Sequence, residues 1–182
     1  MVARDAEPYL REIIVQADYC LVAVLAMNRH LKESNVPLFF REAQAFLVNA
    51  AALSRLLWPA SNGARERGAS LRALLSLPDE HPLRSRKLRD HLEHFDERLD
   101  RWLRETSGRN VVDFHIGPAS VIGGAGIERR DFLRVFEPDR SVFTFRGEEF
   151  DIQLLATSVE ELRSEAIARL ESCRTDAPQG VI

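Results

Sequence analysis

Two long apolar segments in the first third of the chain constrain its fold more than any other feature. Residues 8–33 and 37–58 both place apolar side chains at helical spacing. Proline lies near the start of each segment, where a helix tolerates it, and Pro59 stops the second one. The apolar positions that define the period are Leu10, Ile14, Ala17 and Leu21 in the first segment, and Phe39, Phe46 and Leu53 in the second.

Both predicted helices are apolar around more than one narrow face. In the first, Ile13, Val15 and Tyr19 widen the stripe, and in the second Phe40 and Leu47 do the same. A helix at the edge of a bundle needs only a single stripe. The width therefore predicts either a central place in a bundle or an extra face buried against a partner subunit.

Two shorter helices and a change in composition follow. A third helix is predicted over 69–77, and a fourth from Pro82 to about Thr106, where Gly108 ends it. The next segments, "NVVDFHIGP", "DFLRVFEP", "SVFTFR" and "EEFDIQLL", are rich in β-branched and aromatic residues and are separated by Gly, Pro and Asp turns. They predict a small antiparallel meander, after which a last helix is expected from Val159 to Cys173.

The predicted fold class is therefore mainly α: a bundle of four helices, a small antiparallel β-meander and a C-terminal helix. The bundle should occupy residues 1–108, and the sheet with the last helix, residues 109–182, should pack on it as one compact unit. A chain of 182 residues is long enough for one sizeable core and short for two.

Several features of the sequence favour a soluble, cytoplasmic protein. The most apolar stretch, "IIVQADYCLVAVLAM", contains Gln16 and Asp18 and is shorter than the ~20 residues that a membrane span needs. The first ten residues are charged and lack the apolar run of a signal peptide. Cys20 and Cys173 lie in apolar helical segments, where free cysteines behave as small hydrophobes.

The formal net charge of -3 excludes a uniformly basic nucleic-acid binder. A local basic patch is present nonetheless, because positive side chains outnumber negative ones between Arg65 and Arg89. Such a patch is either a solvated helix surface or a local site for phosphates. Its positive residues are Arg65, Arg67, Arg72, Arg84, Arg86, Lys87 and Arg89.

The stretch "KLRDHLEHFDERLDRW", residues 87–102, places several side chains that could take part in a reaction on the fourth predicted helix. At ~100° per residue its apolar side chains form one core stripe, consisting of Leu88, Leu92, Phe95, Leu99 and Trp102. Asp90 and His94 fall on the opposite face, one turn apart. A carboxylate so placed would keep an imidazole in one tautomer with a pKa near neutrality, which suits proton transfer. Arg89 adds a planar donor that matches phosphate oxygens.

Within this stretch, "RDHLEH", residues 89–94, resembles the motif of the HEPN superfamily, an Arg followed four to six residues later by a His, with a polar residue after the Arg. The resemblance covers residues 8–106 by architecture and only these few residues by motif. It implies a helical bundle in which two copies form one cleft, and often a metal-independent ribonuclease of defence or toxin type. In one toxin branch a Tyr two residues after the His is modified by a partner enzyme, but here that position is Asp96, so that regulation is not expected.

These observations predict a site and two functions. The leading hypothesis is a homodimeric endoribonuclease with catalytic Arg89, His94 and Asp90 and with RNA-binding Arg84, Arg86 and Lys87. An antitoxin partner is also expected for a toxin, although the sequence does not identify one. The second hypothesis is a non-catalytic dimeric scaffold that pairs through the first two helices.

No cofactor and no metal are expected. His91 and His94 could share a metal with Glu93 or Asp90, but no separate cluster supplies a third ligand. Arg86 with His91 also has the HEPN spacing, and Arg89 is preferred because Asp90 fills the polar position after it.

Overall fold

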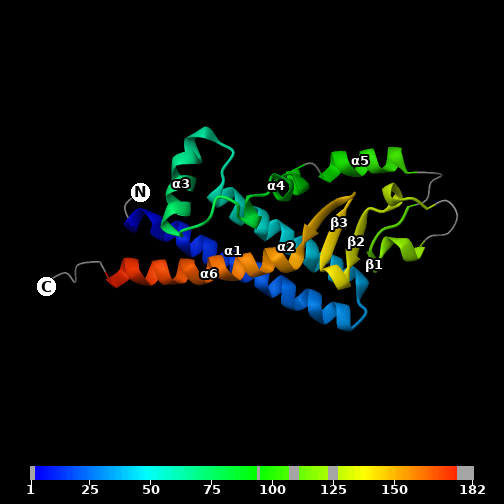
Figure 1. Ribbon diagram of the computed structural model, residues 1–182, viewed down its shortest axis with the longest axis horizontal. Helices are drawn as coiled ribbons and strands as arrows, with labels where there is room; N and C mark the ends of the chain where they lie inside the picture. The colour runs from blue at the N-terminus through cyan, green and yellow to red at the C-terminus, as the bar shows by residue number, and fades with distance from the viewer. Residues whose placement is uncertain (1–2, 94, 107–110, 123–126, 176–182) are drawn as a thin grey trace.

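The computed structural model describes residues 3–93, 95–106, 111–122 and 127–175, and shows a mainly helical protein with a small sheet at one end (Figure 1). The predicted fold class is thus confirmed. The six helices are α1 (Ala3–Lys32), α2 (Val36–Leu57), α3 (Arg65–Leu74), α4 (Arg86–Glu93), α5 (Phe95–Glu105) and α6 (Ile152–Thr175). The strands are β1 (His115–Ile116), β2 (Arg134–Glu137), β3 (Val142–Phe145) and β4 (Glu148–Asp151).

The long helices α1, α2 and α6 form the body of the molecule. Helix α1 packs against α2 along most of its length and against α6 on another side (Figure 1). Its inner face is buried completely at Leu10, Ile13, Ala17 and Cys20. This double packing explains much of its apolar width, yet an outer strip of apolar side chains stays exposed.

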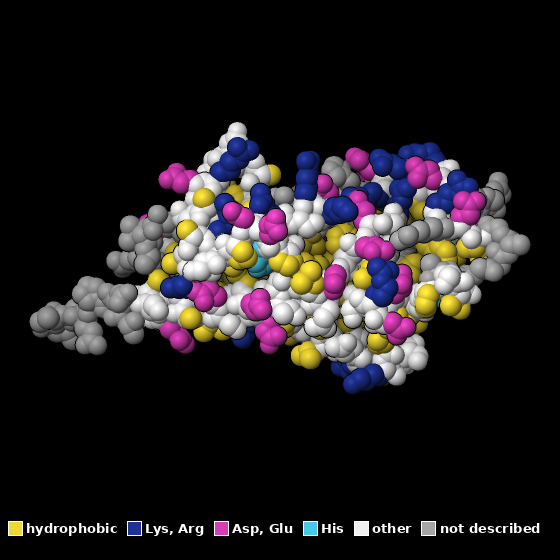
Figure 2. All heavy atoms as spheres, in the orientation of Figure 1, with side chains coloured by type: hydrophobic (Ala, Val, Ile, Leu, Met, Phe, Trp, Pro, Cys, Tyr) yellow, Lys and Arg dark blue, Asp and Glu magenta, His cyan; other side chains and the backbone are white. Residues whose placement is uncertain are grey.

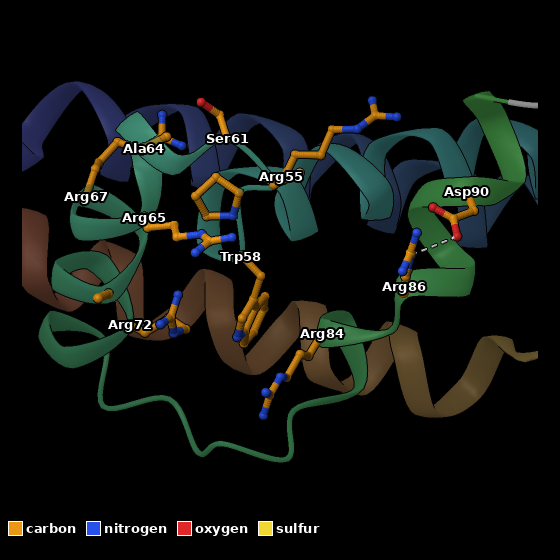
Figure 3. A pocket seen from close by; sticks show the side chains of 13 residues that line it. Arg55, Trp58, Ser61, Ala64, Arg65, Arg67, Arg72, Arg84, Arg86 and Asp90 are labelled. Atoms are coloured by element: carbon orange, nitrogen blue, oxygen red, sulfur yellow. Dashed lines mark ion pairs between the residues drawn. The ribbon is translucent and has the colours of Figure 1, made fainter.

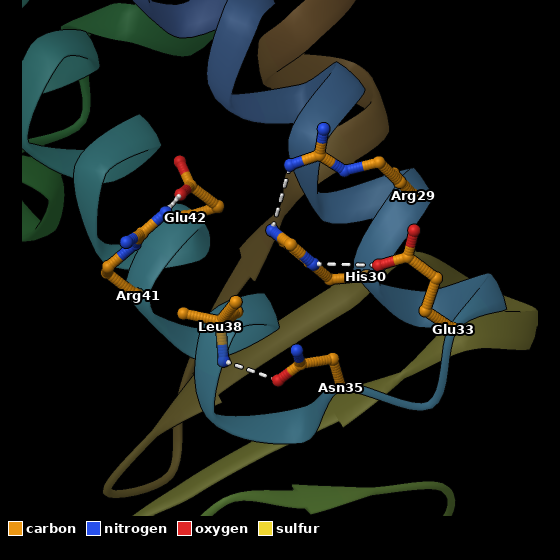
Figure 4. A network of polar contacts seen from close by, with 7 residues as sticks. All are labelled: Arg29, His30, Glu33, Asn35, Leu38, Arg41 and Glu42. Atoms are coloured by element: carbon orange, nitrogen blue, oxygen red, sulfur yellow. Dashed lines mark hydrogen bonds and ion pairs between the residues drawn. The ribbon is translucent and has the colours of Figure 1, made fainter.

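A tight turn joins α1 to α2 (Figure 4). Ser34 adopts a left-handed conformation with φ 55°, and the Asn35 side chain accepts a hydrogen bond from the Leu38 amide at 3.4 Å. This N-cap satisfies one of the free amides in the first turn of α2. His30 is buried at the end of α1, where its Nδ1 lies 3.4 Å from a Glu33 carboxylate oxygen.

Helix α3 begins at Arg65, four residues before the predicted start. The stretch "ASNGARERG", which precedes the predicted start, is therefore not a loop throughout, because its second half is helical. Gly68 is buried against the end of α2, and a Cβ there would lie 2.5 Å from Pro59 Cδ. This glycine therefore permits close helix packing and does not mark a turn.

The fourth predicted helix consists of a short 3-10 turn, Pro82–Arg84, followed by α4 and α5. His94, between the two helices, lies outside the described residues. Of the predicted core stripe, Leu88 and Trp102 are buried and Leu99 is half-buried. The side chains of Leu92 and Phe95 lie outside the described part.

The sheet has the order β1-β2-β3-β4 and is mixed. Strands β2, β3 and β4 form the predicted antiparallel meander, but β1 runs parallel to β2, with His115 opposite Val135. The purely antiparallel prediction is therefore wrong for β1, because a long connection returns the chain to the same end before β2 begins. Arg146 and Gly147, both with positive φ, form the two-residue turn between β3 and β4.

Helix α6 begins at Ile152, seven residues before the predicted start at Val159. The Asp151 side chain accepts a hydrogen bond from the Leu154 amide at 2.8 Å and so caps the helix directly after β4. The segment "EEFDIQLL" was expected to be a strand throughout, but only its first half is.

The sheet packs on α2 through aromatic side chains. The Phe39 ring centroid lies 4.6 Å from that of Phe136, and Phe40 lies 6.0 Å from Phe143. These contacts join the sheet and the helices in one hydrophobic cluster. None of the helices in the described ranges is long and apolar enough to cross a membrane.

Candidate functional site

A cleft of about 1150 Å³ opens between the end of α2, helix α3, the Pro82–Arg84 turn and α4 (Figure 3). We call it the arginine cleft, because six arginines and one carboxylate line it among the side chains that the structure describes. These residues are Arg55 on α2, Arg65, Arg67 and Arg72 on α3, Arg84 in the turn, and Arg86 and Asp90 on α4. In the view of Figure 2, basic side chains lie over α3, α4 and α5, with acidic side chains among them.

Trp58 joins the elements that build the cleft. It caps the C-terminus of α2, and its ring lines the cleft. The Arg72 guanidinium lies over this ring, 5.7 Å from the centroid, and donates a hydrogen bond to the Leu57 carbonyl. A cation that binds a free carbonyl at a helix C-terminus also interacts favourably with the helix dipole. Arg72 therefore fixes α3 against α2.

His81 is the second neighbour of the Trp58 ring, with centroids 5.5 Å apart and planes at 33°. Its Nδ1 accepts a hydrogen bond from the Leu83 amide at 3.2 Å, so the neutral ring carries its proton on Nε2. Burial lowers the pKa of His81 below its usual value, and the nearby charge of Glu161 opposes this effect. The imidazole is thus held neutral and adds no charge beside the cleft.

Arg72 and His81 already pack against the indole of Trp58. These two contacts reduce the part of the ring on which a nucleobase could stack. The groups that the cleft offers to a ligand are therefore guanidinium groups, which bind phosphate or carboxylate oxygens.

Two arginines, Arg84 and Arg86, line the side of the cleft that the Pro82–Arg84 turn and α4 form. Arg84 donates a hydrogen bond to the Asp79 carbonyl at 2.8 Å. Arg86 and Asp90 form an ion pair across one helical turn, with Nε and a carboxylate oxygen 3.3 Å apart (Figure 3). Both arginine side chains are exposed, so their remaining donors reach solvent.

Arg65 and Arg67 extend from the first turn of α3. The Arg67 guanidinium lies over the Tyr9 ring of α1 at 5.2 Å, and its Nε is buried without a hydrogen-bond partner among the described residues. Arg65 is exposed and points toward Trp58 in Figure 3. No carboxylate on α3 lines the cleft, so its positive charge is uncompensated on this side.

The predicted site residues fall partly on this cleft. Arg84 and Arg86 line it, whereas Lys87 is exposed on α4 and does not. Asp90 lines it as well and forms an ion pair with Arg86. His94 and the side chain of Arg89 lie outside the described residues, and with them the predicted contact between Asp90 and His94. The catalytic assignment stays a prediction.

The sequence reasoning missed Arg55 and Trp58. The predicted basic patch covers residues 65–89 only. The fold places the end of α2, with Arg55 and Trp58, beside this patch. The available signal was Pro59, which ends the helix directly after Trp58 and one turn after Arg55, at a place where the chain must turn back.

Metal and thiol chemistry find no support in the described part of the chain. No group of three or more His, Cys, Asp or Glu side chains there could hold a metal ion. The alternative with His91 and His94 lies outside the described side chains. Cys20 is buried, and burial raises the pKa of its thiol to about 12, so it is not a nucleophile near neutral pH.

No family model, no curated protein and no solved structure matches this chain. The fold and the site therefore define only a class, a mainly α protein with an arginine-lined cleft at the end of its second helix. The resemblance to the HEPN superfamily rests on "RDHLEH" and on the helical architecture alone.

Proposed function

We propose that this protein binds RNA through the phosphates of its backbone in the arginine cleft. The observation that carries the proposal is that six arginines from four separate elements line one cleft, where Asp90 is the one carboxylate among the described side chains. Arginine forks bind phosphate oxygens in pairs, and several together attract a polyanion strongly.

The size of the cleft favours a polymer over a small anion. Pockets for small molecules usually enclose about 300–1000 Å³ and contain few charged groups, whereas this cleft has a volume of about 1150 Å³ and has six arginines among its described lining residues. Because Arg72 and His81 already pack against the Trp58 ring, we expect recognition of the backbone and little preference for base sequence. The motif on α4 favours RNA over DNA as the ligand.

Cleavage of the bound RNA is a second proposal. Arg86 and Asp90 bring α4 to the cleft, and Arg89 lies three residues after Arg86 on the same helix. In this proposal His94 removes the proton from a 2′-hydroxyl, whose oxygen attacks the adjacent phosphorus. The bond to the 5′-oxygen breaks, this oxygen takes up a proton from water, and a 2′,3′-cyclic phosphate and a 5′-hydroxyl result. Arg89 stabilises the charge that develops on the phosphate.

RNA binding can be tested with a fluorescent single-stranded RNA and two double variants of equal charge. Arg65→Gln with Arg84→Gln removes two cleft arginines, and we expect affinity to fall roughly 10- to 100-fold. Arg104→Gln with Arg130→Gln removes two exposed arginines elsewhere and should change affinity less than about twofold. Equal losses in both variants would show that net charge, and not the cleft, determines binding.

Cleavage is tested separately, by digestion of the same RNA in EDTA with wild type, Arg89→Ala and His94→Ala. We expect a cyclic phosphate product from wild type only. Full activity in both variants would exclude these residues from the reaction. RNA that is bound but never cut would contradict the second proposal and leave the first intact.

A further inference from the structure

One side of α1 is apolar and exposed along its middle. Val15 is 39% exposed, Tyr19 55%, Val22 62% and Leu25 70%. Their spacing of four, three and three residues puts them on one side of the helix. We call these four residues the outer α1 face. It lies opposite the side that packs on α2 and α6, and it is larger than the scattered single exposures that a monomer normally shows.

The outer α1 face contains no unpaired charge. Asp18 is the only charged residue between Ile13 and Asn28, and its carboxylate binds Arg163 of α6 at 2.5 Å. A charge that is already neutralised beside an apolar strip costs less to cover than a free one. A partner can therefore cover this side of α1 without burying an unpaired charge.

Charged side chains of opposite sign lie at the two ends of the outer α1 face. Glu12 is exposed before it, and Arg29 is exposed after it. Arg11, on the N-terminal side, is already bound to Glu7 at 2.6 Å. Arg29 extends from the end of α1, where one of its nitrogens lies 3.3 Å from His30 Nε2 (Figure 4).

We propose that a second copy of this chain covers the outer α1 face, with the two α1 helices antiparallel about a twofold axis. Helix α1 is self-complementary in this arrangement. Residues equally far from the midpoint between Cys20 and Leu21 face each other: Tyr19 meets Val22, Val15 meets Ala26, and Glu12 meets Arg29. A twofold interface repeats each contact, so the pairing places an ion pair at both ends.

The alternatives fit the same features less well. In a parallel pair Glu12 would face Glu12 and Arg29 would face Arg29, which is repulsive at both ends. A lipid surface would favour basic residues along the polar border of the helix, but here one end carries an exposed acid. Between Glu12 and Arg29 the helix rises ~25 Å, so one helix pair forms a modest interface and we expect a dimer that dissociates at roughly micromolar concentration.

Sedimentation equilibrium of the full chain tests the surface. We expect the wild type to change from monomer to dimer with rising concentration, and Val22→Glu with Leu25→Glu to weaken the dimer about 100-fold or more. The matched control is Leu103→Glu with Val121→Glu, which adds the same charges at exposed apolar positions elsewhere. Far-UV circular dichroism confirms that each variant is folded, since all four positions are exposed.

Charge reversal tests the antiparallel orientation. Glu12→Arg alone and Arg29→Glu alone should each weaken the dimer by roughly 3- to 10-fold, and the two together should restore it to within about twofold of wild type. A monomer at every concentration, or a dimer that survives the paired glutamates, would overturn the proposed surface. Failure of the double reversal to restore affinity would overturn the antiparallel arrangement.

Discussion

Gly68 shows how a single residue determines the shape of the arginine cleft. It is buried where α3 turns back against the end of α2. A side chain at this position would collide with the backbone carbonyl of Leu57, 2.8 Å from the added Cβ, and with the ring of Pro59. Neither atom belongs to a flexible side chain, so α3 would have to move away.

Gly68→Ala should therefore destabilise the protein by about 1–3 kcal/mol, although alanine is normally the better helix residue. The displaced α3 carries Arg65, Arg67 and Arg72, so RNA affinity should fall as well. Urea unfolding measures the first effect and RNA anisotropy the second. Gly63→Ala is the control, since a Cβ there meets nothing within 4 Å. A stable Gly68→Ala variant would mean that α3 does not pack this closely.

His81 makes stability depend on pH. Burial lowers the pKa of His81 in the folded protein, while the unfolded chain takes up a proton near pH 6.5. Between the two pKa values the unfolded state binds more protons, so the free energy of unfolding decreases as the pH falls below 6.5. The stabilisation is complete above that pH.

We expect His81→Asn to reduce this pH dependence. Asparagine can still accept the hydrogen bond from the Leu83 amide, but it does not titrate. The measurement is the difference in free energy of unfolding between pH 5 and pH 7.5, compared with wild type. An unchanged difference would assign the pH dependence to other groups.

At the scale of elements, ion pairs attach α5 to the β3–β4 hairpin. Arg98 binds Glu148 at 2.6 Å, and Arg146 binds Glu105 at 2.6 Å. Arg146 also donates to the Arg98 carbonyl at 2.7 Å, so it contacts α5 at two points. Trp102 adds the main apolar contact of this helix.

Arg146→Met should loosen α5 because it removes both contacts while keeping the length of the side chain. We expect a loss of about 1–2 kcal/mol and faster hydrogen exchange in α5 than in α1. Arg140→Met is the matched control, since the ion pairs of Arg140 within the described part of the chain are with Glu137 and Glu149 near the sheet. Its exchange profile in α5 should match wild type, and equal effects of the two variants would contradict the attachment.

At the scale of the whole molecule, the sheet and the helices share one hydrophobic cluster. Phe40 on α2 is buried and lies near Phe143 of the sheet and Phe114 of the preceding segment. Contacts of this kind couple the two parts, because neither can unfold without exposing the aromatic side chains of the other.

We therefore expect a single unfolding transition, in which tryptophan fluorescence and far-UV circular dichroism coincide. Phe40→Ala should destabilise the molecule by about 3–5 kcal/mol and shift both signals together. Val48→Ala, at an exposed position of the same helix, should shift neither appreciably. Separate transitions in the Phe40 variant would show two independent units.

The sequence by itself determined the features that depend on neighbouring residues. Helical spacing predicted α1 and α2 within about five residues at the described ends, and the proline near the start of each segment helped to place its beginning. The meander of β2 to β4 followed from short β-branched runs and turn residues. Periodicity, caps and turns are local, so the order of residues contains this information directly.

Only the tertiary structure decided which distant residues meet. Arg55 joins Arg65 and Arg84 in one cleft because α3 folds back on α2, and no local pattern records that return. The parallel pairing of β1 and the early start of α6 also depend on contacts between segments far apart in the chain. Such contacts depend on long-range packing and on which apolar surfaces are buried together. The spacing of residues within one segment contains no information about either.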